Sequence, residues 1–244
     1  MLLSGERIDQ LYADGIQIIQ SKEVFSFSLD AVLLANFPNL PKSGKIVDLC
    51  AGNGAVGLFA SQKTKAKIIQ VELQSRLADM GKRSITLNKL ENQVEMLELD
   101  LKEAATVIKP DSVDLVLCNP PYFKELPTSI KNPNPYLAIA RHEIHTSLEE
   151  VITVSAKLLK TNGRLAMVHR PDRFLDILHA MEQAKIAPKR IRFVYPKEGR
   201  EANTLLIEGI KHGKKDGFKV LPPLFTYDED NNYSAEMKAM LYGN

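Results

Sequence analysis

Short apolar runs alternate with helical segments from residue 45 onward. Each run is almost continuously hydrophobic and is bounded by turn residues, which is the pattern of strands buried on both faces of a parallel sheet. We expect strands at Lys45–Cys50, Lys67–Glu72, Val94–Leu97, Val113–Cys118 and Arg164–His169. Helical patterns between and after the strands cover Ala55–Gln62, Ser75–Asn88, Leu101–Ile108, Leu148–Lys160 and Arg173–Ala184.

Two further strand-like runs, Arg190–Tyr195 and Asn203–Ile210, follow with no helical segment between them. Strands joined without a crossover helix pair antiparallel. The pattern therefore predicts an α/β fold: a doubly wound, mostly parallel seven-stranded sheet that ends in an antiparallel hairpin.

The chain divides into three parts. Residues 1–43 form an N-terminal appendage, with a strand at Ile16–Gln20 leaving a hairpin and a short helix at Ala31–Ala35. Residues 44–210 form the main domain, and residues 211–244 are a polar tail without a readable role. A long connection at residues 120–146 contains several prolines, and we expect it to act as a lid that contacts substrate, with a flexible insertion as the alternative.

Composition sets limits on the class of protein. The chain has 244 residues, and its 32 Lys and Arg nearly balance 30 Asp and Glu, so any attraction to nucleic acid must come from local clusters. We interpret the two cysteines as reduced thiols of a cytoplasmic protein. No signal peptide or membrane span is expected because no apolar run approaches ~18 residues. The histidines show no metal-ligand spacing, so no metal is predicted.

A glycine loop follows the first parallel strand. Residues 52–57 match the dinucleotide-binding pattern G-x-G-x-x-G, and Glu72 ends the next strand. However, the Asp48 carboxylate opposes a pyrophosphate and suits the cationic sulfonium of S-adenosyl-L-methionine. Glu72 would accept hydrogen bonds from the ribose hydroxyls, and Asp100 from the adenine amino group. We assign to this cofactor site Asp48, Gly52, Asn53, Gly54, Glu72, Leu73, Asp100 and Leu101. A loop-bracing role for Asp48 and a helix-capping role for Asp100 are the alternatives.

Asn119-Pro120-Pro121-Tyr122 ends the strand Val113–Cys118. The fourth strand of such a sheet neighbours the first, so Asn119 and Gly52 should face one pocket. The Asn119 side-chain oxygen and the Pro120 carbonyl can each accept one N–H of a planar amine, while Tyr122 or Phe123 stacks on its ring. We predict that Asn119, Pro120 and Tyr122 are catalytic, that Asn119 also borders the cofactor, and that Pro121 and Phe123 contact substrate. Together with the glycine loop, this corner predicts methyl transfer to nitrogen.

These residues carry a resemblance to a known family. Residues 48–57, Glu72 and residues 119–122 resemble the class I S-adenosylmethionine-dependent methyltransferases of the (Asn/Asp)-Pro-Pro-(Tyr/Phe) type, which have a Rossmann-like fold. More narrowly, Phe25–Ala35 and Arg190–Leu206 are similar to the group that methylates N6 of adenosine 37 in a valine tRNA.

The resemblance implies a tRNA substrate and further site residues. It places Asp30 in a segment that closes over the cofactor, and it suggests that Arg141 and His142 contact substrate or order the lid. A solvated helix start is the alternative for the last two residues.

A cluster of basic residues bears on the choice of substrate. Its members are Lys189, Arg190, Arg192, Lys197 and Arg200, followed by lysines of the tail. We predict that Arg190 and Arg192 bind tRNA phosphates, although solvated strand ends explain the cluster equally well. The alternatives of the same class are a glutamine-N5 methyltransferase acting on a translation factor and an rRNA base N-methyltransferase. Alternatives of another class are a nucleotide-binding oxidoreductase and a non-catalytic RNA-binding module.

Overall fold

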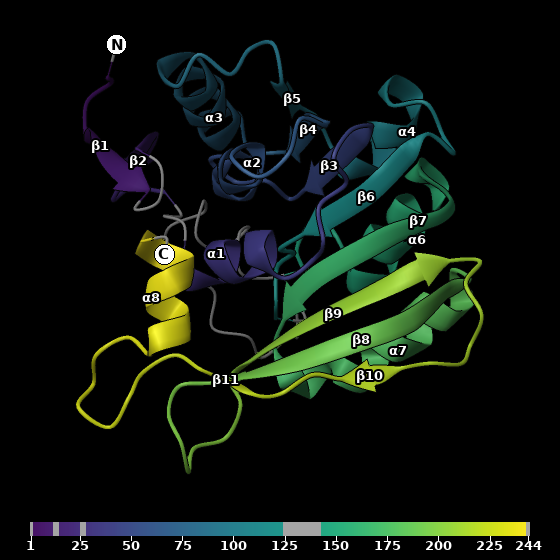
Figure 1. Ribbon diagram of the computed structural model, residues 1–244. Coiled ribbons are helices and arrows are strands. Elements are labelled where there is room, and N and C mark those ends of the chain that lie inside the picture. Colours follow the sequence, from purple (N-terminus) through teal and green to yellow (C-terminus); the bar gives the residue numbers. More distant parts are fainter. Residues whose placement is uncertain (1, 12–14, 25–27, 124–142, 243–244) are drawn as a thin grey trace.

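The computed structural model describes residues 2–11, 15–24, 28–123 and 143–242. Seven strands are the expected ones: β3 (Lys45–Leu49), β4 (Lys67–Glu72), β5 (Val94–Glu98), β6 (Val113–Cys118), β7 (Leu159–His169), β8 (Ile186–Tyr195) and β9 (Thr204–Lys211). The two-residue strands β10 (Lys219–Val220) and β11 (Leu224–Phe225) both pair with β8. In the described residues these make one nine-stranded sheet in the order β10-β8-β9-β7-β6-β3-β4-β5, with β11 beside β8 (Figure 1).

The sheet confirms the predicted fold class. β3, β4, β5, β6 and β7 run parallel, whereas β9 lies antiparallel between β7 and β8. β6 pairs with β3, as the prediction of a shared pocket requires. The predicted count of seven strands omits β10 and β11, because strands of two residues leave no alternating pattern in a sequence.

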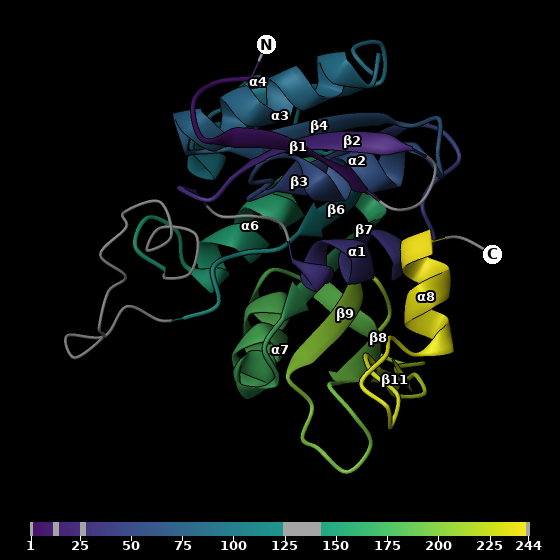
Figure 2. The same ribbon diagram turned by 90° about the vertical axis from the view of Figure 1, so that its left-hand side faces the viewer.

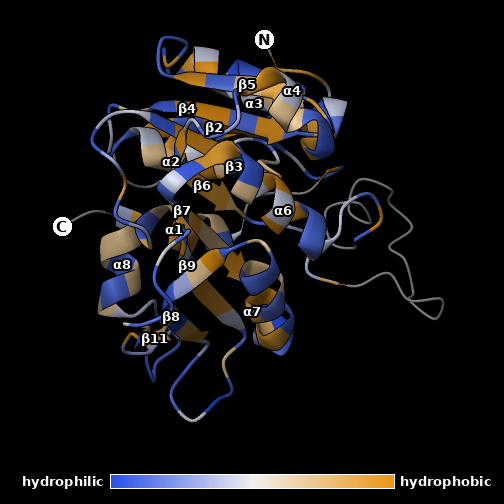
Figure 3. Cartoon of the chain, turned by 90° about the vertical axis from the view of Figure 1, so that its right-hand side faces the viewer, coloured by the Kyte–Doolittle hydropathy of each residue, from blue (hydrophilic) through white to orange (hydrophobic). Residues whose placement is uncertain are grey.

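Helices cover both faces of the sheet. One face carries α1 (Leu29–Asn36), α2 (Ala55–Ser61), α3 (Ser75–Leu87) and α8 (Ala235–Tyr242). The other carries the 3₁₀ turn η1 (Leu101–Glu103) with α4 (Ala104–Val107), then α6 (Leu148–Leu158), the 3₁₀ turn η2 (Pro171–Arg173) and α7 (Phe174–Gln183). Figure 3 shows hydrophobic residues concentrated in the sheet and hydrophilic residues in the loops.

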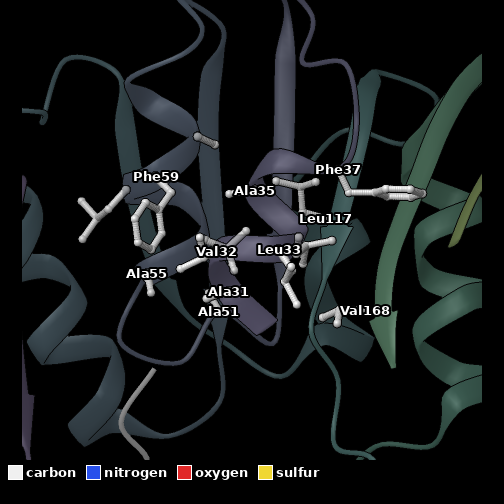
Figure 4. Packing of buried hydrophobic residues seen from close by; sticks show 14 of the residues in the cluster. Ala31, Val32, Leu33, Ala35, Phe37, Ala51, Ala55, Phe59, Leu117 and Val168 are labelled. Carbon is white, nitrogen blue, oxygen red and sulfur yellow. The ribbon is translucent and has the colours of Figure 1, made fainter. Parts of the chain in front are cut away.

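Successive residues of one strand enter different hydrophobic clusters. On β6, Leu115 and Leu117 pack with α1 and α2, whereas Val116 and Cys118 pack with α6 and α7. Side chains of a strand alternate between its two faces, so a strand that is buried on both must be apolar throughout. Figure 4 shows the first cluster, with Leu33 of α1 beside Leu117 and Val168 of the sheet, and Val32 on the side of Ala55 and Phe59 of α2.

The N-terminal segment confirms the predicted hairpin. β1 (Glu6–Leu11) and β2 (Ile16–Ser21) form a separate antiparallel pair, and β2 packs on α3. The last described helix lies beside the first: α8 contacts α1, and Figures 1 and 2 show them adjacent. Met237 and Leu241 of α8 are buried in the cluster that contains α1. The C-terminal segment therefore contributes to the core, a role that its polar sequence conceals.

In the part of the chain that the structure describes, no helix is both long enough and apolar enough to traverse a bilayer.

Candidate active site

A cavity of about 400 Å³ lies at the carboxyl ends of β3, β4 and β6. Its size falls in the range of small-molecule sites, roughly 300–1,000 Å³. The parallel strands direct their following loops to this edge of the sheet, which is where ligands bind in open α/β folds. The wall includes these predicted site residues: Asp30, Gly52, Asn53, Glu72, Leu73, Asp100, Leu101, Asn119, Pro120, Pro121, Tyr122 and Phe123. Asn119 and Gly52 therefore share one cavity, as the strand order predicts.

Glu72 ends β4 and is held by two backbone groups of the glycine loop and the following turn. Its Oε2 accepts a hydrogen bond from the Gly52 N–H at 2.8 Å, and its Oε1 accepts one from the Gln74 N–H at 2.8 Å. Only 6% of the residue is exposed. Burial raises the pKa of the Glu72 carboxyl, while these N–H groups lower it. A carboxylate has about four acceptor sites, so Glu72 can still accept a hydrogen bond from a ribose hydroxyl on this side of the cavity.

Asp48 lies beneath the glycine loop and is wholly buried. Its Oδ2 accepts a hydrogen bond from Gln70 Nε2 at 3.2 Å, and the same amide donates to the Gly54 carbonyl at 2.9 Å. Burial is the main cause that raises the pKa of Asp48 to about 7. Gly54 adopts a left-handed φ of +89°, and a Cβ there would lie 2.9 Å from the Gln70 amide oxygen. Asp48 and Gly54 thus support the loop from behind the cavity wall, and the structure does not bring them to the cavity.

Gln70 is a functional neighbour that the sequence analysis missed. It is fully buried on β4 directly opposite Asp48 on β3. The available signal was one amide within the otherwise apolar run Ile68-Ile69-Gln70-Val71, since a buried polar side chain needs partners.

The Asn-Pro-Pro-Tyr corner is linked to the first helix. Tyr122 Oη lies 2.7 Å from Asn119 Oδ1 and 2.9 Å from Asp30 Oδ2. The Tyr122 ring centroid is 5.0 Å from that of His169, at an interplanar angle of 42°. Both the ring and the hydroxyl of Tyr122 therefore contact other residues of the protein. Of the two aromatic side chains predicted to stack on a substrate ring, Phe123 is the exposed one, at 42%.

Residues at the end of β7 and directly after it support this corner and were also missed. The Arg170 guanidinium lies 5.6 Å from the centre of the Phe123 ring, and Arg170 lines the cavity. The buried Arg173 donates from Nη1 to the Tyr122 carbonyl at 3.3 Å and to Glu143 Oε1 at 2.7 Å. His169 is wholly buried and accepts the Arg170 N–H at 2.8 Å; burial lowers its pKa to about 3. These partners come from distant parts of the sequence, so no local pattern indicates them.

The structure does not bring Arg190 and Arg192 to the cavity. Arg190 donates to Glu208 Oε1 at 3.1 Å and to the Phe37 carbonyl at 3.0 Å, with its guanidinium 4.7 Å from the Phe37 ring. Arg192 forms two hydrogen bonds with Glu236, at 2.6 and 2.7 Å. These two side chains connect β8 to the end of α1 and to α8, so each guanidinium already has partners within the protein.

Three remaining assignments have plain outcomes. Asp100 caps η1 by accepting the Lys102 N–H at 2.9 Å, and it also lines the cavity, so its two predicted roles are compatible. Arg141 and His142 lie outside the described residues. Across the described ranges, no group of three His, Cys, Asp or Glu side chains is arranged to hold a metal ion.

Fold and site together define a methyltransferase. The model of the methyltransferase small domain family matches residues 15–186. A tRNA1(Val) (adenine(37)-N6)-methyltransferase of Bacteroides fragilis is 28% identical over 205 residues, covering 78% of this chain and 85% of the relative. The enzyme of that name from Shewanella putrefaciens is 25% identical, covering 73% and 74%. The crystal structure of a predicted O-methyltransferase, protein Atu636 of Agrobacterium tumefaciens, has a TM-score of 0.70 at 21% identity, covering 88% and 96%.

The family model spans most of the chain, and the chain therefore belongs to the methyltransferase small domain family. The predictions of a methyltransferase enzyme and of S-adenosylmethionine as its cofactor are confirmed.

Proposed function

We propose that this enzyme transfers a methyl group from S-adenosylmethionine to the exocyclic N6 of an adenine in tRNA, at position 37 of a valine tRNA. The observation that carries the proposal is the placement of Asn119 and Pro120 on the same cavity as the buried Glu72 carboxylate. The names of the relatives from Bacteroides fragilis and Shewanella putrefaciens support adenine in tRNA over other amines.

The cavity can hold the cofactor and orient an amine. When bound, the cofactor supplies an electrophilic methyl carbon on a cationic sulfur. Glu72 and the Gly52 turn, which line the cavity, would bind its nucleoside part, and Asn119 would lie at the acceptor end. An exocyclic amine is a weak nucleophile because its lone pair is delocalised into the ring. The Asn119 oxygen and the Pro120 carbonyl would each accept one N–H, which directs the lone pair toward the methyl carbon. Positioning of this kind can supply roughly 7–11 kcal/mol, so no strong general base is required.

Phe123 is suited to hold the target base. An aromatic face that stacks on a nucleobase contributes on the order of 1–3 kcal/mol. The Arg170 guanidinium beside Phe123 adds a cation next to the cavity. A base in the anticodon loop can be unstacked for a few kcal/mol, whereas a duplex base is less accessible.

The β8–β9 loop is the better candidate for phosphate contacts. β8 and β7 are both antiparallel to β9, so β8 ends at the same edge of the sheet as β7 and the active site. Lys197 and the exposed Arg200 belong to this loop. We therefore assign tRNA binding to this part of the basic cluster in place of Arg190 and Arg192.

The test is methyl transfer from labelled cofactor to total tRNA and, separately, to total protein. We expect label in tRNA, and nucleoside analysis should identify it as N6-methyladenosine. Label in N5-methylglutamine would support the glutamine methyltransferase, and a labelled base in rRNA, offered as a third substrate, would support the rRNA alternative.

Asn119→Ala gives the matching mechanistic control. It should retain cofactor binding but lose most turnover, because removing one preorganised hydrogen-bonding group raises a barrier by ~2.7–4 kcal/mol. Asn119→Asp should keep partial activity, since an acceptor oxygen remains. Full activity of Asn119→Ala would contradict the assigned role.

A further inference from the structure

A chain of hydrogen bonds joins Asp30, Tyr122 and Asn119 on the cavity wall. Tyr122 Oη lies 2.7 Å from Asn119 Oδ1 and 2.9 Å from Asp30 Oδ2, and Ser28 Oγ donates to the same Asp30 oxygen at 3.1 Å. All four residues line the cavity. Asp30 lies in the first turn of α1 and Tyr122 follows β6, so the chain links the N-terminal helix to the acceptor corner.

The Tyr122 hydroxyl has one proton and therefore cannot donate to both neighbours. If Asp30 is neutral, its O–H donates to Tyr122, and Tyr122 donates to the Asn119 oxygen. If Asp30 is ionised, Tyr122 donates to the carboxylate, because hydrogen bonds to ionised acceptors are the stronger ones. Tyr122 Oη must then accept from Asn119. The Asn oxygen and NH₂ group have nearly the same shape, so the amide can turn over without repacking.

We propose that Asp30 and Tyr122 are positioning residues which turn the Asn119 amide so that its oxygen, and not its NH₂ group, faces the substrate amine. This rests on the proposed function, in which the amine donates to Asn119. In the arrangement with ionised Asp30, Tyr122 holds the Asn119 NH₂ and leaves the oxygen for the substrate. In the other arrangement, the Asn119 NH₂ meets the substrate N–H, and two donors face each other.

The charged and titratable groups around Asp30 set the pH at which Asp30 is protonated and the Asn119 amide turns. Burial raises the pKa of Asp30 above its ordinary value of 3.8, while the Tyr122 and Ser28 hydroxyls and the Arg170 guanidinium lower it. Turnover should therefore decline on the acid side at a pH above 3.8, as Asp30 takes up a proton. His169 contacts the Tyr122 ring but has a pKa lowered to about 3, so it stays neutral through that decline.

The kinetic test is kcat as a function of pH with unmethylated tRNA. Tyr122→Phe should lower kcat at least about tenfold and abolish the acid decline, since a misplacement of about 1 Å costs roughly 10²-fold. Asp30→Asn should give a low and pH-independent kcat, because its NH₂ group directs the Tyr122 proton toward Asn119. Asp30→Glu should recover part of the wild-type kcat and part of the acid decline. Wild-type kcat in Tyr122→Phe, or an acid decline that persists in both variants, would overturn the proposal.

Two controls distinguish the hydrogen-bond chain of Asp30, Tyr122 and Asn119 from effects that any lost hydroxyl or titratable side chain would have on turnover. Tyr227→Phe removes a hydroxyl from a tyrosine stacked on Tyr233 in the C-terminal segment, and it should leave the pH profile unchanged. His145 is a further titratable side chain on the cavity wall, and His145→Gln should keep the acid decline if Asp30 is its source.

A spectroscopic test is independent of the substrate. The side-chain NH₂ resonance of Asn119 can be observed in protein labelled with ¹⁵N-asparagine and identified by its loss in Asn119→Ala. It should shift with pH at the midpoint of the kinetic decline, and Tyr122→Phe should abolish the shift. A pH-invariant resonance would overturn the proposal that Asp30 and Tyr122 turn the Asn119 amide. A resonance that shifts while tRNA contains no N6-methyladenosine would instead refute only the proposed function.

Discussion

Asp48 and Glu72 are buried carboxyl groups on neighbouring strands, but they differ in their hydrogen-bond partners. Glu72 accepts two backbone N–H groups and faces the cavity, whereas Asp48 lies behind the wall beside the Gln70 amide. The sequence spacing of the glycine loop and an acid at the next strand end predicts the position of Glu72. It cannot distinguish a carboxylate that faces a ligand from one that braces a loop, because both lie near the carboxyl end of a strand.

The buried Asp48 carboxyl should make folding stability depend on pH. Its pKa is raised from 3.8 to about 7, so between these values the folded state holds a proton that the unfolded state has released. The free energy of unfolding should therefore fall as pH rises from 4 to 7, by up to about 4 kcal/mol from this group. Urea unfolding across this range checks the slope. Asp48→Asn should flatten it, and an equal slope in both proteins would contradict the assignment.

Glu72→Gln should weaken binding of S-adenosylmethionine by ~1.5–3 kcal/mol, the range for a hydrogen bond to a charged group. Titration calorimetry measures the change. Glu95→Gln makes the same substitution on an exposed residue of the neighbouring strand and should leave the affinity unaltered. An unchanged affinity in Glu72→Gln would remove Glu72 from the cofactor site.

At the scale of elements, the sequence pattern predicts strands and helices well where the chain is regular. It is wrong at the junction of α6 and β7, where the predicted helix runs to Lys160 but α6 ends at Leu158 and β7 begins at once. The backbone becomes extended at Leu159, directly after the helix. No glycine or proline marks this boundary, so the sequence gives no signal for it. The role of α8 was equally hidden, since only Met237 and Leu241 of that helix are buried.

Met237 should be the main anchor of α8. It is fully buried against the cluster that contains α1, so Met237→Ala should lower the free energy of unfolding by about 2–5 kcal/mol. Lys238→Ala removes the exposed side chain that follows Met237, and it should change the free energy of unfolding by at most about 0.5 kcal/mol. Chemical denaturation of both variants compares them. Equal stability would show that α8 does not support the core.

At the scale of the whole molecule, the sequence predicts best that the fourth parallel strand neighbours the first and that the last two strands pair antiparallel, because strands with intervening helices allow few arrangements. The surface that meets RNA is predicted less well. Arg190 and Arg192 look like free cations in a linear sequence, but their partners Glu208 and Glu236 become visible only in the folded chain. Charge clusters indicate a binding surface only after the internal ion pairs have been subtracted.

Arg200→Glu should weaken tRNA binding and reduce its dependence on salt. Each lost phosphate contact lowers the slope of log affinity against log salt concentration by about 0.7–0.9. Lys65→Glu makes the same change of charge at an exposed position before β4, on the opposite edge of the sheet. Filter binding at several salt concentrations compares the two. If both variants show the same slope as the unmodified enzyme, the β8–β9 loop does not contact the phosphates.

The pairing of α1 with α8 also affects the order of events during synthesis. These helices contact each other, yet α8 begins at Ala235, about 200 residues after α1 ends at Asn36. Ribosomes add about 5–20 residues per second, so α8 is synthesised roughly 10–40 s after α1. During that interval the part of α1 that α8 later covers is open to chaperones and to other nascent chains. The helix that carries Asp30 therefore reaches its final packing only after translation has passed the catalytic domain.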